Sequence, residues 1–188
     1  MIKIVETTLK DLKILEFSKF FDDRGYFFES YNKNVFEKLG IKNEFVQDNI
    51  SVSKSKVIRG MHGQMKPNQA KLVRCLYGEI YDVAIDIRKN SITYMHHFGL
   101  KLSKKNNRAL FIPHGFLHGF SVLSEEDAIV TYKTTGIYNK NGEYGVNPTS
   151  CKINWLVDSP ILSARDLESL HLEDFIKSEI FTKIQNSL

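Results

Sequence analysis

Two residues that could together remove a proton from carbon stand nine positions apart in the chain. His62 ends the run Ile58-Arg59-Gly60-Met61-His62, and Lys71 opens the apolar run Lys71-Leu72-Val73. An imidazole titrates near neutrality and can accept the proton, while an ammonium can stabilise the anion that is left behind. The pair therefore indicates chemistry at a carbon next to a carbonyl, as in a keto sugar.

Such a base needs further groups around it. A carboxylate on its second nitrogen would fix the tautomer, and Asp82 and Asp166 are the candidates. Inversion of a carbon also requires an acid on the opposite face, for which Tyr132 or Tyr138 would serve. The same residues have structural interpretations, since Lys71 could belong to a structural ion pair and a tyrosine could be a satisfied core residue.

A second histidine motif resembles half of a metal site. Pro113-His114-Gly115-Phe116-Leu117-His118 has the form of the second half of a cupin metal motif, but the first half is His62-Gly63-Gln64. Gln replaces the second His, and it is a poor donor for zinc, iron or manganese. We therefore expect no metal and no cofactor, and we expect His96, His97 and His171 at the surface.

Strand patterns surround these residues. The side chains from Ile80 to Arg88 alternate between two faces of a predicted strand. A second strand, Lys71 to Leu76, precedes it and is joined to it by a predicted hairpin turn at Tyr77-Gly78. That hairpin would pair Val73 with Asp82 and Lys71 with Ala84, so all four would share a face and Lys71 would have an acidic neighbour. Further strands are predicted over residues 98–102, 109–112, 120–123 and 128–134.

Helices are few in this pattern. Asn34 is predicted to cap a short helix that ends at Gly40. Phe175, Ile176, Ile180, Phe181 and Ile184 recur at helical spacing and predict a C-terminal amphipathic helix, packed on the barrel or on a second subunit. The prediction is one domain over 1–188, mainly β, with a cupin-type double-stranded β-helix jelly roll and peripheral helices.

Composition narrows the function classes. The 188 residues are 42% hydrophobic and 26% charged, with a dispersed net charge of +4, which argues against a nucleic-acid partner. No apolar run approaches the roughly 20 residues of a membrane span, and the N-terminus does not resemble a secretory signal. The two cysteines, Cys75 and Cys151, suggest no disulfide framework, so a reducing cytoplasm is expected.

With these motifs in order, the chain resembles the dTDP-4-dehydrorhamnose 3,5-epimerases, a family of cupin-fold enzymes of deoxysugar nucleotide biosynthesis. The resemblance extends from about Leu15 to Asp166. The segments that match the family are residues 22–30, 45–49, 58–62, 71–74, 82–88, 112–120, 132–135 and 161–166.

The resemblance implies roles. His62 falls on the catalytic base, Asp166 on its paired carboxylate, Lys71 on the lysine near the sugar C4 oxygen and Tyr132 on the opposite acid. The positions implied for substrate binding are Arg24, Glu29, Gln47, Asn49, Arg59, His118 and Tyr138. It also implies a homodimer in which one subunit completes its neighbour's site, and no metal.

The chain departs from the family's usual pattern at Gly63, His114, Leu117 and Asn154, which we expect around the pocket. The nucleotide base (dTDP, CDP or GDP), the deoxy pattern of the sugar and the inverted carbon (C3, C5 or both) stay open. The alternatives are a 3,4-ketoisomerase, an inactive sugar-nucleotide-binding cupin and a metal-dependent cupin.

Overall fold

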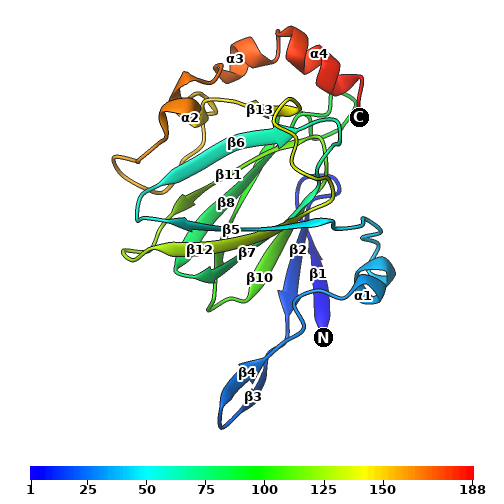
Figure 1. The fold of residues 1–188 in the computed structure, drawn as a ribbon, viewed down its shortest axis with the longest axis vertical. Coiled ribbons are helices and arrows are strands. Elements are labelled where there is room, and N and C mark those ends of the chain that lie inside the picture. Colours follow the sequence, from blue (N-terminus) through cyan, green and yellow to red (C-terminus); the bar gives the residue numbers. More distant parts are fainter.

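The computed structural model describes residues 1–188 and is built mainly from strands (Figure 1). A six-stranded sheet has the order β1-β2-β10-β7-β12-β5. Its strands are Ile2–Glu6 (β1), Lys13–Phe17 (β2), Arg108–Ile112 (β10), Lys71–Tyr77 (β7), Ala128–Thr134 (β12) and Gln47–Ser53 (β5). All of these neighbours are antiparallel.

A five-stranded sheet with the order β13-β6-β11-β8-β9 faces the first. Its strands are Glu143–Gly145 (β13), Ile58–Gln64 (β6), Phe116–Val122 (β11), Glu79–Asp86 (β8) and His97–Ser103 (β9). A buried cluster between the sheets draws Val73 and Val130 from the first sheet, and Ala84 and Phe120 from the second. This arrangement confirms the predicted mainly β, cupin-type jelly roll.

The predicted hairpin between β7 and β8 is wrong. Gly78 does form a turn with φ of +72°, but the turn passes the chain from one sheet to the other. Val73 pairs with Leu110 and Tyr132, not with Asp82. The reason is that β7 and β8 are both central strands: β7 pairs with β10 and β12, and β8 pairs with β11 and with β9, the next strand along the chain. The two strands still face the same interior, from opposite sides.

The other predicted strands are present with small shifts in their bounds. Residues 98–102 and 109–112 lie inside β9 and β10, and 128–134 is β12. The strand expected at 120–123 begins four residues earlier, because all of Phe116–Val122 is buried and paired with β8.

The helices differ in detail from the prediction. Helix α1 (Lys33–Lys38) is capped by Asn32 instead of Asn34, and Gly40 follows it with φ of +82°. The C-terminal pattern forms two short helices, α3 (Leu172–Phe175) and α4 (Glu179–Gln185), because Ser178 caps α4 and interrupts the turn. None of the helices is long and apolar enough to cross a membrane.

The C-terminal segment covers the outer face of the five-stranded sheet (Figure 1). Phe175, Phe181 and Ile184 are buried against a cluster that includes Ile85 and Leu117 of that sheet. Helix α2 (Ala164–Glu168) and a 3-10 turn (Pro148–Ser150) contact each other and β6 on the same side. In this chain, therefore, the apolar helical face packs on the chain's own sandwich.

A small hairpin extends away from the sandwich at the bottom of Figure 1. It consists of β3 (Phe20–Asp22) and β4 (Gly25–Phe27). Phe21 and Phe27 are 75% and 71% exposed, far more than aromatic residues of the core. Exposed aromatic rings grouped in this way are unusual on the surface of a monomeric protein.

Candidate active site

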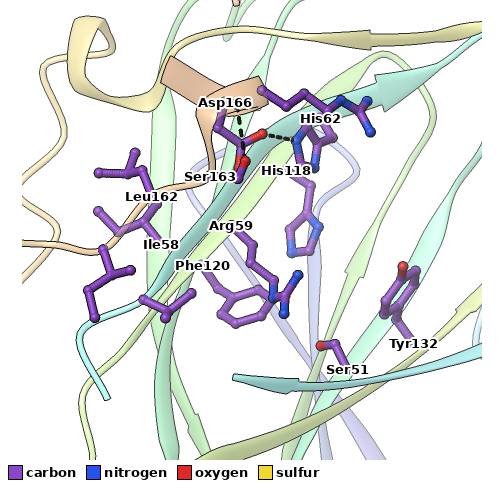
Figure 2. Close-up of a pocket in the computed structure, with 13 residues that line it drawn as sticks. Ser51, Ile58, Arg59, His62, His118, Phe120, Tyr132, Leu162, Ser163 and Asp166 are labelled. Carbon is purple, nitrogen blue, oxygen red and sulfur yellow. Dashed lines mark hydrogen bonds and ion pairs between the residues drawn. The ribbon is translucent and has the colours of Figure 1, made fainter. Parts of the chain in front are cut away.

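A cavity of about 460 Å³ opens between the two sheets and α2 (Figure 2). Its polar lining comprises Ser51, Arg59, His62, His118, Tyr132, Ser163, Arg165 and Asp166. Strands β5 and β12 contribute one wall, and β6 and β11 the other. Of the site residues predicted from the sequence, the cavity brings together His62, Asp166, Tyr132, Arg59 and His118, and Lys71 is not part of its lining.

His62 is paired with Asp166 at the top of the cavity (Figure 2). Nε2 of His62 lies 2.7 Å from Oδ1 of Asp166, a buried residue in the first turn of α2. Burial alone would raise the pKa of the Asp166 carboxyl, but hydrogen bonds from His62, Ser163 and the Gly60 backbone outweigh it and lower the pKa. An ionised Asp166 accepts a hydrogen bond from Nε2–H of His62, which leaves Nδ1 of His62 as the basic nitrogen.

Both His62 and Arg59 line the cavity, although residues three apart on a regular strand face opposite ways. A register shift in the pairing of β6 with β11 lies between them, since His118 pairs with His62 but Phe120 pairs with Arg59. Gly60 makes this possible, with φ of +125° and no room for a Cβ against the Gly119 backbone. The shift brings the base and the arginine to one cavity.

Asp82, the alternative partner of His62, instead holds His118. Nε2 of His118 lies 2.8 Å from Oδ1 of Asp82, and both side chains are buried. In the β8–β11 pairing, Asp82 is opposite Phe120 and Ala84 is opposite His118, so the two partners are diagonal neighbours on one face. Burial lowers the pKa of His118 despite the opposing charge of Asp82.

Lys71 and Tyr132 project from adjacent strands of the other sheet. Lys71 pairs with Thr134, and Tyr132 with Val73, which places all four on the inner face. Burial lowers the pKa of Lys71 to about 8, against the opposing charges of Asp82 and Glu143. Burial raises the pKa of Tyr132, so this phenol keeps its proton at neutral pH.

The base and the phenol therefore face each other from different sheets. In Figure 2, Tyr132 and Ser51 lie across the cavity from His62 and His118. A flat group held between them would meet a proton acceptor on one face and a proton donor on the other. This arrangement is suited to inversion of a carbon.

A second cavity of about 260 Å³ adjoins the first and shares Tyr132 with it. Gln47, Asn49 and Tyr138 line it, and Nε2 of Gln47 donates to Oδ1 of Asn49 at 2.8 Å. Three predicted substrate-binding residues thus lie together beside the reaction centre.

Glu143 and Arg165 are site residues that the sequence reasoning missed. Glu143 lines the second cavity, accepts a hydrogen bond from Tyr138 at 3.0 Å and pairs with Arg165 at 2.8 Å. Arg165 could have been suspected because it precedes Asp166. Nothing local marks Glu143, since its place depends on β13 pairing with β6.

The remaining predicted binding residues occupy different places. Arg59 bridges the sheets at the cavity, donating to Ser53 Oγ at 2.8 Å and to the Val52 carbonyl at 3.3 Å. Arg24 lies in the extended hairpin and pairs with Asp22, and Glu29 binds Asn32. Neither Arg24 nor Glu29 lines either of these two cavities.

The donors of a cupin metal site do not converge here. Gln64 is fixed structurally, because its amide donates to the carbonyls of Pro67 and Ile137 and accepts from the Asn139 N–H. No group of three His, Cys, Asp or Glu side chains is arranged to hold an ion. The exposed positions of His96, His97 and His171 agree with the prediction.

The expectation that the unusual positions cluster around the pocket is largely wrong. His114 and Asn154 are exposed, and Leu117 is buried in the cluster beneath the C-terminal helices. Only Gly63 borders a cavity, and the space above its Cα is filled by the ring of Tyr144. Adjacent strand residues face opposite ways, which carries Leu117 away from the cavity that His118 lines.

Comparison with known proteins gives a consistent result. Residues 6–174 match the family model described as dTDP-4-dehydrorhamnose 3,5-epimerase. The enzyme of that name from Shigella flexneri is 46% identical over 182 residues, covering 95% of this chain and 98% of the relative.

Solved structures agree. The Elizabethkingia anophelis dTDP-4-dehydrorhamnose 3,5-epimerase is 45% identical with a TM-score of 0.87, covering 92% of this chain and 97% of that one. A Legionella pneumophila dTDP-6-deoxy-D-glucose-3,5-epimerase, solved with dTDP-4-keto-L-rhamnose, is 40% identical with a TM-score of 0.88. The match covers 92% of this chain and 94% of that one. The chain belongs to the dTDP-4-dehydrorhamnose 3,5-epimerase family.

Proposed function

We propose that this protein inverts C3 and C5 of a dTDP-linked 4-keto-6-deoxyhexose, the reaction for which its relatives are named. The ketone at C4 acidifies the C–H bonds on both of its neighbours. The observation that carries the proposal is the placement of His62 and Tyr132 on opposite walls of one cavity. The departures at His114, Leu117 and Asn154 do not line that cavity, which favours the substrate of the relatives.

In the proposed reaction, Nδ1 of His62 takes the proton from the carbon next to the ketone. The C–H electron pair becomes the enolate, and Lys71 stabilises its oxygen. Tyr132 then returns a proton to the carbon from the opposite face. His62 releases the proton that it took to solvent, and Tyr132 recovers one from solvent, so both groups return to their starting forms. Asp166 keeps the His62 tautomer and stabilises the imidazolium. No redox partner is needed, because the electrons stay in the substrate.

The nucleotide would bind to the polar residues next to the sugar site. Arg59 suits the diphosphate because a guanidinium binds phosphate oxygens in pairs. His118 would contact the sugar, and Gln47, Asn49 and Tyr138 line the adjoining cavity for the nucleoside. We assign neither metal nor cofactor to the reaction.

Arg24 and Glu29 would act in a homodimer. The hairpin that carries Arg24 extends from its own subunit and exposes Phe21 and Phe27. Docked on a second copy, it would bury these rings and bring its arginine to the partner's site. We further propose that residues 1–188 act as one domain, in the cytoplasm, where sugar nucleotides are made.

The decisive experiment is turnover in D₂O followed by NMR, with dTDP-, CDP- and GDP-linked 4-keto-6-deoxyhexoses. The proposal expects inverted product from the dTDP sugar, with deuterium at C3 and C5. Label at one carbon would restrict the activity to that carbon. A product with its carbonyl at C3 would indicate a ketoisomerase, and saturable binding without exchange an inactive cupin. Turnover without label would refute the enolate route.

A further inference from the structure

Asp82 is a buried carboxylate that the proposed reaction does not use. Its side chain is fully buried on β8, facing the space between the two sheets. Oδ1 holds Nε2 of His118 at 2.8 Å, while Oδ2 is buried and has no hydrogen-bond partner. An ionised carboxylate with one free oxygen is costly to bury, so its charge has to be offset by a nearby cation.

The cation that faces it is Lys71, which lies on the inner face of β7 in the opposite sheet and makes no direct ion pair with Asp82. Asp82 acts on Lys71 through its charge and favours the ammonium form, against the burial that opposes it. The other charged groups around the lysine are Glu143 on β13, which also favours the ammonium, and His118 on β11, whose charge would disfavour it. Asp82 is the stronger of the two supporting carboxylates.

The same carboxylate fixes the protonation pattern of His118. A carboxylate can only accept, so Nε2 of His118 bears a proton that it donates to Oδ1. Burial keeps the ring neutral, because the pKa of His118 is lowered. Nδ1 therefore carries a lone pair, and His118 meets a ligand as a hydrogen-bond acceptor.

We propose that Asp82 is a positioning residue that keeps Lys71 in its ammonium form and holds His118 as a neutral acceptor. This role rests on the proposed function only for its benefit to catalysis, since both effects exist in the free enzyme. One buried carboxylate thus determines the protonation states of two residues of the sugar site. A hydroxyl or amide N–H of the substrate is the group that His118 would recognise.

The effect on Lys71 can be measured without any substrate. Trace acetylation with acetic anhydride across a pH series, followed by peptide mapping, gives the titration midpoint of Lys71 in the folded protein. The Asp82→Asn variant should titrate about one pH unit lower than wild type, because a nearby charge has been removed. In kcat/KM, the alkaline limb should move down by the same amount.

Asp86→Asn is the matched control. Asp86 is also a fully buried carboxylate of β8, but its partners are Arg88, Ser91 and Thr93. Its loss should lower the melting temperature without moving the Lys71 midpoint. A folded Asp82→Asn protein with the wild-type midpoint would overturn the role of Asp82, whether or not the protein proves to be an epimerase.

A second measurement uses the wild-type protein, so it does not depend on a variant that folds. Long-range proton–nitrogen NMR of labelled histidines distinguishes a protonated from an unprotonated ring nitrogen. At pH 7, His118 should show a protonated Nε2 and an unprotonated Nδ1. The opposite tautomer, or a doubly protonated ring, would overturn the assignment of His118 as an acceptor.

Discussion

His62 and His118 are paired directly across β6 and β11, yet Nε2 of each histidine is hydrogen-bonded to a different carboxylate. The partner of His62 comes from α2 at the rim, and that of His118 from β8 in the interior. His62 is 29% exposed and can meet a substrate carbon, whereas His118 is 8% exposed. Both histidines line the cavity, so the two chemically identical pairs differ in exposure and not in access to the site, and only the more exposed one is suited to meet a substrate carbon.

Loss of the His62 imidazole should nearly abolish turnover. His62→Ala is expected to lower kcat by roughly 10²–10⁴-fold, the usual contribution of a positioned base. Asp166→Asn should also lower kcat strongly, since an amide cannot stabilise the imidazolium. Coupled product assays would measure both, with the exposed His97→Ala as control. A His62→Ala enzyme that keeps a tenth of the activity would contradict the assignment.

Tyr132→Phe should separate proton removal from inversion. His62 remains in this variant, so deuterium from D₂O should still enter the substrate, with the configuration retained. Inversion should fall by at least about 10²-fold, because the opposite face has lost its acid. NMR of recovered substrate reports exchange and inversion together. Equal losses of exchange and inversion would assign Tyr132 a role in binding instead.

The rate should fall in alkaline solution as Lys71 loses its proton. The pKa of Lys71 is lowered by burial to about 8, so the ammonium is present below that pH and is lost as the pH rises through it. Since kcat/KM reports the free enzyme, its alkaline limb should lie near pH 8. Burial raises the pKa of Tyr132, so the phenol is not the source of this limb.

Lys71→Arg provides the control for that assignment. A guanidinium keeps its charge throughout the accessible range, so whatever activity remains should have no limb near pH 8. An unchanged limb in Lys71→Arg would mean that another group titrates there. Rate profiles from pH 6 to pH 10, with stability checked at each pH, would decide the matter.

Gly63→Ala should destabilise the protein by roughly 1–3 kcal/mol, the usual cost of overpacking a core. A Cβ at this position would collide with the ring of Tyr144, which is buried and stacked on Phe175. Tyr144→Leu in the same chain should reduce the penalty, which a double-mutant cycle of urea unfolding would reveal. Additive effects would show that the ring is not the obstacle.

The aromatic hairpin should control assembly. Phe21→Ser with Phe27→Ser removes two exposed rings that belong to none of the core clusters. We expect the variant to shift from dimer to monomer in light scattering, with a raised KM because Arg24 no longer reaches a second subunit. Unchanged melting of the isolated monomer would confirm that the fold itself is intact. A wild-type protein that is monomeric would refute this proposal.

Much of the reaction centre could be predicted from local sequence. His62, Lys71 and His118 stand in distinctive runs, and the alternation of β8 and β12 is visible because side chains on a strand alternate between faces. The replacement of a metal-binding His by Gln64 is likewise a matter of residue type. These features depend only on residue types and on residues close together in the sequence, and the structure contains them.

Only the tertiary structure decided which residues meet. Residue types alone left Asp82 and Asp166 open as partners of His62, and only the family resemblance favoured Asp166, which the structure pairs with His62. The strand pattern also placed β7 and β8 in one hairpin, although they belong to opposite sheets. It gave no sign of the register shift that turns Arg59 toward His62, nor of Glu143. Strand pairing between distant segments is chosen by the packing of the whole core, so no local pattern contains it.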